Sequence, residues 1–164
     1  MLELGAPTSV LRTIAEPRED KVRPKSGYHA AFSRPYTVAA GLLGGGGLGV
    51  FHDDFTDEAA ADPARPELAA KVHCVPDARC DEIFPHQFPA VPRARLRDGR
   101  ELEERVDANR GGPQNPLSAD ELATKVRLNA ARVLPAEVSK RITELTYGLA
   151  ALGDLTELTG LLRT

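Results

Sequence analysis

Apolar residues between positions 29 and 43 recur at the spacing of one helix face. The steps between them are 4, 3, 1 and 3 residues, which align the side chains on one side of a helix with about 3.6 residues per turn. These residues are Phe32, Tyr36, Ala39, Ala40 and Leu43. Proline is tolerated in the first turn of a helix, so Pro35 makes Ser33 the expected N-cap. The glycines at positions 44–47 are expected to end this helix.

A second pattern, in which apolar and polar residues alternate, extends over residues 91–108. Asp98 and Gly99 interrupt the alternation. An Asp-Gly pair between alternating runs is a strong hairpin signal, because a two-residue hairpin turn needs positive φ at both central residues. We therefore predict two antiparallel strands joined at Asp98-Gly99. Residues 9–14 predict one further short strand, which is stable only as part of a sheet.

The last third of the chain has helical signals. Ser118 and Glu121 form an S-x-x-E capping box, which predicts a helix that continues to about residue 133. Pro135 predicts the start of a second helix, Asp154 the cap of a third, and residues 66–72 an earlier short helix. Because no strand–helix–strand alternation is present, we expect an α+β fold. It would be a small antiparallel or mixed sheet with a hairpin packed on helices, followed by C-terminal helices.

Composition and charge narrow the class of protein. The chain has 164 residues and a formal net charge of −3 with both signs interspersed, so it offers no basic surface for nucleic acid or a membrane. The apolar stretch at residues 38–50 is too short to span a bilayer, which needs about 20 apolar residues. Cys74 and Cys80 fit neither a disulfide scaffold nor a C-x-x-C site, so we expect a reduced, cytoplasmic protein. The histidines at 52, 73 and 86 lack metal-ligand spacing, so no metal site is predicted.

Three segments together resemble the C-terminal part of the MmgE/PrpD family. Residues 24–39, P-K-S-G-Y-H-A-A-F-S-R-P-Y-T-V-A, are similar to the family's segment P-x-[ST]-G-Y-x-A-x-F-S-x-P-Y-x-V-A. The second segment joins L-R-D-G-R at 96–100 to R-G-G-P-Q-N-P-L-S at 110–118, and a helix with Lys125 follows. The third is a leucine-spaced tail that ends L-T-G-L-L at 158–162. Order and spacing agree with the family over about residues 10–162.

The resemblance implies enzymes that act on di- and tricarboxylic acids, such as 2-methylcitrate dehydratase, cis-aconitate decarboxylase and iminodisuccinate epimerase. Such enzymes combine a large helical domain with a smaller α+β lid, hold the substrate in the cleft between them, and need no cofactor or metal. Residues 1–115 would form the lid, and residues 116–164 would be helices that pack on a helical domain this sequence lacks. We therefore expect the chain alone to be incomplete and inactive, with that helical domain and a second copy of the chain as expected partners.

The resemblance implies Tyr36 as the main catalytic residue, because the family's lid directs a tyrosine toward the substrate. A phenol there could donate a hydrogen bond or a proton to a carboxylate or enolate oxygen. The alternative is a core tyrosine, since Tyr36 shares a helix face with Phe32. His29 is a second candidate acid or base, with a structural histidine as the alternative. Candidate ligands for an anionic substrate, which are otherwise solvated cations, are Lys21, Lys25 and Arg34.

Together these features favour the lid-and-tail portion of an MmgE/PrpD-type lyase acting on a small polycarboxylate by dehydration, decarboxylation or epimerisation. The alternative is a non-catalytic protein, either a truncated remnant or a module that pairs with a separately encoded helical domain. A neighbouring reading frame that encodes such a domain would favour a split enzyme, and its absence would favour a remnant.

Overall fold

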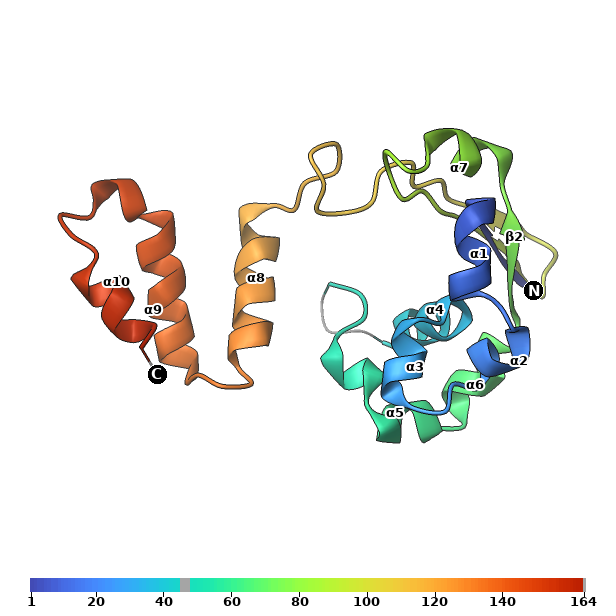
Figure 1. Cartoon of the computed structure of the whole chain (residues 1–164), viewed down its shortest axis with the longest axis horizontal. Coiled ribbons are helices and arrows are strands. Elements are labelled where there is room, and N and C mark those ends of the chain that lie inside the picture. Colours follow the sequence, from blue (N-terminus) through green and yellow to red (C-terminus); the bar gives the residue numbers. More distant parts are fainter. Residues whose placement is uncertain (45–47, 164) are drawn as a thin grey trace. The chain divides into compact units, whose positions relative to one another are not determined.

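The computed structural model describes residues 1–44 and 48–163 (Figure 1). The chain divides into two compact units, Met1–Pro116 and Leu117–Thr164. Among the described residues, the first unit holds a four-stranded sheet with short helices, and the second holds helices alone. The mixed sheet and the helices confirm the predicted α+β class.

The sheet has the strand order β2-β1-β3-β4. Strand β1 pairs parallel with β2 and antiparallel with β3, and β3 pairs antiparallel with β4. A parallel pair needs a long crossover connection, and here the helices between β1 and β2 provide it. The strands are β1 (Leu2–Ala6), β2 (Val72–Pro76), β3 (Val91–Arg95) and β4 (Glu101–Glu103).

The strand register separates an apolar from a charged sheet face. One row contains Val72, Leu2, Ala94 and Leu102, and the next row contains His73, Glu3, Arg93 and Glu103. Helix α4 (Arg34–Leu43) lies over the apolar row, because its Val38 and Leu42 line a cavity of about 420 Å³ together with Leu2 and Val72. The apolar side of the sheet is therefore the side that faces α4.

The strand predicted at residues 9–14 is wrong, because Thr8–Ile14 forms helix α1. The N-terminal strand is β1, whose Leu2, Leu4 and Ala6 alternate with Glu3 and Gly5. Pro7 follows as the N-cap of α1. Proline has no N–H to contribute to a strand ladder, so it ends β1 and begins the helix at once.

The hairpin at Asp98-Gly99 is confirmed, although its turn differs from the one expected. The Leu96 N–H donates to the Arg100 carbonyl at 2.8 Å, so the loop contains three residues. Gly99 has φ +86, and no non-glycine residue described in the chain has positive φ. A three-residue loop needs only its last residue in the left-handed region, which explains why the glycine alone adopts it.

The helix predicted over residues 29–43 is split in two. Helix α3 ends at Ala31, and Ser33 then caps α4 as predicted by accepting a hydrogen bond from the Tyr36 N–H at 3.1 Å. Gly44 is the C-cap, with φ +120, and the remaining glycines at 45–47 lie outside the described residues. The other helices of this unit are α2 (Arg18–Val22), α3 (Gly27–Ala31), the 3-10 helix η1 (His52–Phe55), α5 (Asp57–Ala61), α6 (Ala64–Ala69) and α7 (Ala78–Ile83).

The second unit follows its local sequence signals closely. Ser118 and Glu121 form the predicted capping box, and Pro135 precedes the next helix. Asp154 accepts a hydrogen bond from the Thr156 N–H at 2.8 Å, but the N-cap of the last helix is Leu155. The elements are α8 (Ala119–Ala130), α9 (Ala136–Tyr147), η2 (Leu149–Ala151) and α10 (Thr156–Leu161).

Over the described ranges 1–44 and 48–163, no helix combines the length and apolar character needed to cross a bilayer. The same ranges contain no cluster of three or more histidine, cysteine or acidic side chains that could hold a metal ion.

Candidate functional site

A groove of about 440 Å³ opens between the end of α1 and helices α2 and α3. It contains three of the five residues predicted from the sequence, namely Lys21, Lys25 and His29. Two lysines and a histidine at one groove make it the best candidate for binding an anionic ligand. Its full lining is Thr13, Glu16, Pro17, Asp20, Lys21, Lys25, Tyr28, His29 and Phe32.

Lys21, one of the lining residues, is held by two backbone carbonyls. Its ammonium donates to the Thr13 carbonyl at 2.5 Å and to the Phe32 carbonyl at 2.8 Å. These carbonyls lie at the C-terminal ends of α1 and α3, where the helix dipole favours a cation. An ammonium has three N–H donors, so one remains for a ligand. Lys21 therefore joins two helix ends and has limited capacity to bind substrate.

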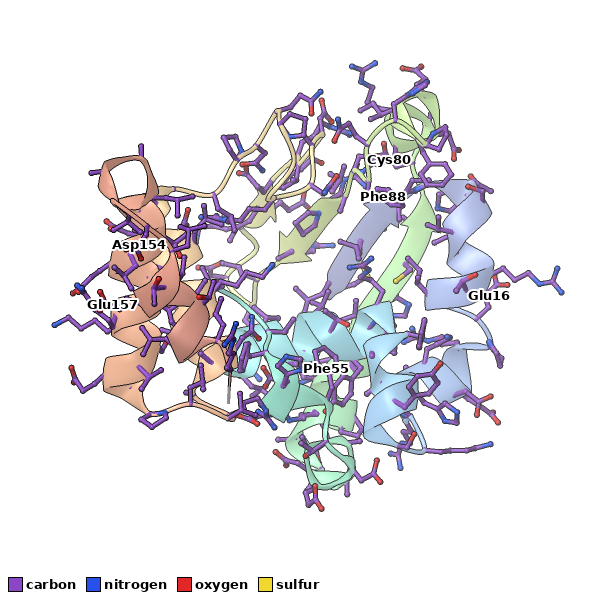
Figure 2. The ribbon with its side chains drawn as sticks, turned by 60° about the vertical axis from the view of Figure 1, so that its left-hand side comes forward. Glu16, Phe55, Cys80, Phe88, Asp154 and Glu157 are labelled. Atoms are coloured by element: carbon purple, nitrogen blue, oxygen red, sulfur yellow. The ribbon has the colours of Figure 1, made fainter. Side chains whose placement is uncertain are left out.

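Lys25 and His29 form the exposed part of the groove. Lys25 lies 3.6 Å from Asp20, and their side chains are 75% and 48% exposed, so this ion pair is weak and easily exchanged. His29 is exposed in α3, next to the Tyr28 ring. Tyr28 and Phe32 add an apolar rim, with their ring centroids 5.3 Å apart in an edge-to-face contact. Glu16 lies at the outer edge of the same unit (Figure 2).

Arg34 does not line the groove. It occupies the first position of α4 and is exposed. Its charge acts on Cys74 of β2, where burial raises the pKa of the thiol and the Arg34 and Arg18 cations partly oppose that rise. The structure therefore separates Arg34 from the other predicted substrate ligands.

Tyr36 is enclosed in the core of the first unit. Its side chain is 0% exposed, and its hydroxyl donates to the Asp54 carbonyl at 2.8 Å. Ala30, Ala40 and Phe55 pack around it. Burial raises the pKa of the Tyr36 phenol, more than the nearby Arg65 cation lowers it. This geometry corresponds to the core tyrosine that the sequence left open as the alternative.

Asp54 and Arg65 form a partly buried ion pair beside Tyr36. Arg65 Nη1 lies 3.1 Å from Asp54 Oδ1, and the two side chains are 15% and 10% exposed. The second carboxylate oxygen of Asp54 accepts a hydrogen bond from the Phe51 N–H at 2.9 Å. Figure 2 shows Phe55, from the same short segment, among the helices of this unit. Nothing in the local sequence pointed to this pair, because its members lie on different elements.

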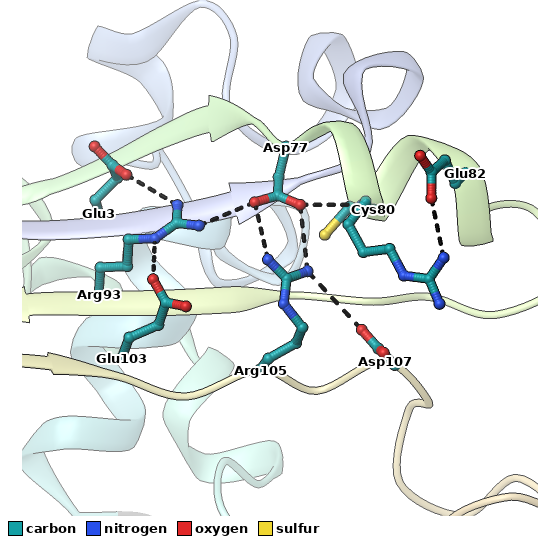
Figure 3. A network of polar contacts seen from close by, with 9 residues as sticks. Glu3, Asp77, Cys80, Glu82, Arg93, Glu103, Arg105 and Asp107 are labelled. Atoms are coloured by element: carbon teal, nitrogen blue, oxygen red, sulfur yellow. Dashed lines mark hydrogen bonds and ion pairs between the residues drawn. The ribbon is translucent and has the colours of Figure 1, made fainter.

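A second polar network covers the charged sheet face and has a structural role (Figure 3). Arg93 contacts Glu3 at 3.1 Å, Asp77 at 3.0 Å and Glu103 at 2.6 Å, and Arg105 adds a contact to Asp77 at 3.3 Å. The hydrogen bonds from Arg105 and Arg93 hold the pKa of the Asp77 carboxyl well below its usual range. The cations and carboxylates of this network satisfy one another, so it joins β1, β3, β4 and the start of α7.

Comparison with known proteins adds one finding. The family model described as the MmgE/PrpD C-terminal domain matches residues 2–149. No curated protein matches the chain.

Proposed function

Because the chain belongs to the MmgE/PrpD family, we propose that it contributes the C-terminal domain of a lyase acting on a small di- or tricarboxylic acid. The family match over most of the chain carries this proposal. The groove at α1–α3 supports it, because a substrate carboxylate requires cations, and Lys21 and Lys25 both line that groove.

The proposed binding mode follows from the contacts of the two lysines. A substrate carboxylate would displace the exposed Asp20 from Lys25. It would also accept a hydrogen bond from the N–H of Lys21 that the two carbonyls leave unused. The apolar rim formed by Tyr28 and Phe32 would contact the carbon chain of the acid. Since Glu16 and Asp20 balance the two lysines in charge, the groove alone would bind a polycarboxylate weakly.

The proposed chemistry is elimination or proton transfer next to a carboxylate. In a dehydration, a base removes the proton from the carbon beside the carboxylate, the C–O bond breaks, and an acid protonates the hydroxide that leaves as water. His29 is the acid or base that this chain would supply at the groove. Tyr36 would serve as a proton donor only after its hydroxyl broke the hydrogen bond to the Asp54 carbonyl and formed one to the substrate.

A helical domain is the proposed partner of the second unit. Among the described residues of this unit, seven large apolar side chains are exposed, and exposed apolar surface of this kind is where a partner protein would bind. A helical partner would bury these side chains. The exposed residues are Leu122, Val126, Val133, Tyr147, Leu149, Leu155 and Leu162.

The alternative function is a non-catalytic module that only associates with such a domain. Two observations favour it: the Lys21 ammonium is already bound by two carbonyls, and the Tyr36 phenol is enclosed. In that case the groove binds no ligand, and the chain acts only through the exposed helices that bind the helical domain.

Titration of citrate into the full chain, followed by amide chemical shifts, tests the proposal. We expect shifts at α2 and α3, and a Lys25→Gln variant that binds about 1.4- to 5-fold more weakly, the range for an exposed ion pair of ~0.2–1 kcal/mol. Arg79→Gln is the matched control, because Arg79 is also an exposed cation, at 57% against 75% for Lys25, and lies outside the groove. Absence of shifts in the groove at millimolar citrate would favour the non-catalytic alternative.

A further inference from the structure

The short helix η1 covers the Tyr36 side chain. The Phe55 ring centroid lies 6.0 Å from that of Tyr36, and the Asp54 carbonyl accepts the phenol hydrogen bond at 2.8 Å. Tyr36 is fully buried beneath this cover. Contact between the phenol and any ligand therefore requires that the cover move.

Arg65, from helix α6, is the side chain that ties η1 down. Its Nη1 lies 3.1 Å from Asp54 Oδ1, and its guanidinium carbon lies 5.8 Å from the centroid of the Tyr36 ring. Arg65 Nε is buried, makes no hydrogen bond among the described residues and lies 3.9 Å from Asp62 Oδ2 as an ion pair. One hydrogen-bonded contact between Arg65 and Asp54 thus joins α6 to the segment above the phenol.

We propose that Arg65 is a positioning residue that holds η1 closed over Tyr36, and that release of the Arg65–Asp54 pair exposes the phenol. In the closed state the Tyr36 hydroxyl donates to the Asp54 carbonyl, and in the open state it becomes a free donor at the surface. The use of that donor in catalysis rests on the proposed function, whereas the closure depends only on contacts within this chain. Local opening of this kind requires less free energy than global unfolding.

The experiment measures how often Tyr36 becomes accessible in the native chain. In a Tyr28→Phe, Tyr147→Phe background, Tyr36 is the single tyrosine and the chain has no tryptophan. Nitration by tetranitromethane, quantified by peptide mass, then reports on Tyr36 alone. The charged groups that influence the Tyr36 pKa are Arg65, Asp54 and Asp62, so all variants are compared at one pH.

We expect Arg65→Met to increase the nitration rate of Tyr36 at least tenfold, which corresponds to ~1.4 kcal/mol of opening free energy. Arg65→Lys should restore most of the protection, because a lysine keeps a cation within reach of Asp54. Arg79→Met is the matched control, since it removes the exposed arginine of the Arg79–Glu82 pair and should leave the rate unchanged. The increased rate should depend little on low urea concentrations, because opening η1 exposes little surface.

Three results would overturn the proposal: equal rates in Arg65→Met and the parent chain, an equal increase in Arg79→Met, or a urea dependence equal to that of global unfolding. If Arg65→Met does not fold, Asp54→Asn replaces it. This change leaves the backbone carbonyl that accepts the Tyr36 hydrogen bond in place and removes the negative charge that pairs with Arg65. Nitration needs no substrate, so failure to bind citrate would contradict the proposed function and leave this result intact.

Discussion

Replacement of Tyr36 by phenylalanine separates a structural from a catalytic role for this residue. The change removes one hydroxyl, which donates to the Asp54 carbonyl at 2.8 Å in a site with 0% exposure of the tyrosine. Loss of a buried hydrogen bond that deprives its partner of a donor costs about 1–3 kcal/mol. For a unit of this size, each kcal/mol lowers Tm by about 4 °C, so we expect a decrease of roughly 4–12 °C.

The assay is thermal and urea unfolding followed by circular dichroism. Tyr28→Phe is the matched control, because it makes the same chemical change at a side chain that is 73% exposed. A surface change of that kind alters stability by about 0.5 kcal/mol or less. The urea m-value should be the same in all three proteins, since none of the changes alters the surface exposed on unfolding.

A catalytic Tyr36 would give the opposite result. A charge-assisted hydrogen bond made only in the transition state is worth about 1.5–3 kcal/mol, or roughly 10- to 150-fold in turnover. If Tyr36→Phe kept the Tm of the parent chain and lowered turnover by that factor in a complex with a helical domain, our reading of the buried phenol would be refuted.

Three further changes test other parts of the structure. Gly27→Ala would place a Cβ 1.9 Å from the Phe55 carbonyl oxygen, so we expect a loss of about 1–3 kcal/mol in urea unfolding; stability equal to the parent would contradict the close packing of α3 on η1. The pKa of Asp77 is lowered in the folded chain, so its contribution to stability is present above the unfolded pKa of about 3.9 and is lost as the pH falls below that value. Asp77→Asn should therefore reduce the loss of stability at acid pH in a stability–pH curve. An unchanged loss would exclude Asp77 as its source. Ser118→Ala removes the hydroxyl that accepts a hydrogen bond from the Glu121 N–H at 3.2 Å, and should lower the stability of the second unit by about 1 kcal/mol. The measurement is the protection of α8 amides from hydrogen exchange, and unaltered protection would argue against the capping box.

The sequence by itself determined the features that depend on neighbouring residues. Ser33 and Ser118 cap their helices because each side chain bonds to a backbone N–H three residues later. Gly99 determines the hairpin because glycine adopts positive φ without a steric penalty. The family was also identifiable from ordered motifs, and the match to residues 2–149 confirms it.

Only the tertiary structure decided which strands pair and what surrounds each candidate residue. Strands β1 and β2 join residues 70 positions apart, as in the pair Leu2 and Val72, so β2 carries no local signal of its partner. The same holds for the site: Lys21 and His29 share a groove, Arg34 lies elsewhere, and Tyr36 is enclosed. The helix pattern shows that Tyr36 lies on an apolar face, but the segment that covers its ring is η1, residues 52–55, whose Asp54 contacts both Tyr36 and Arg65. Burial is a property of the assembled contacts, and those contacts depend on distances in space that residue spacing along one element does not contain.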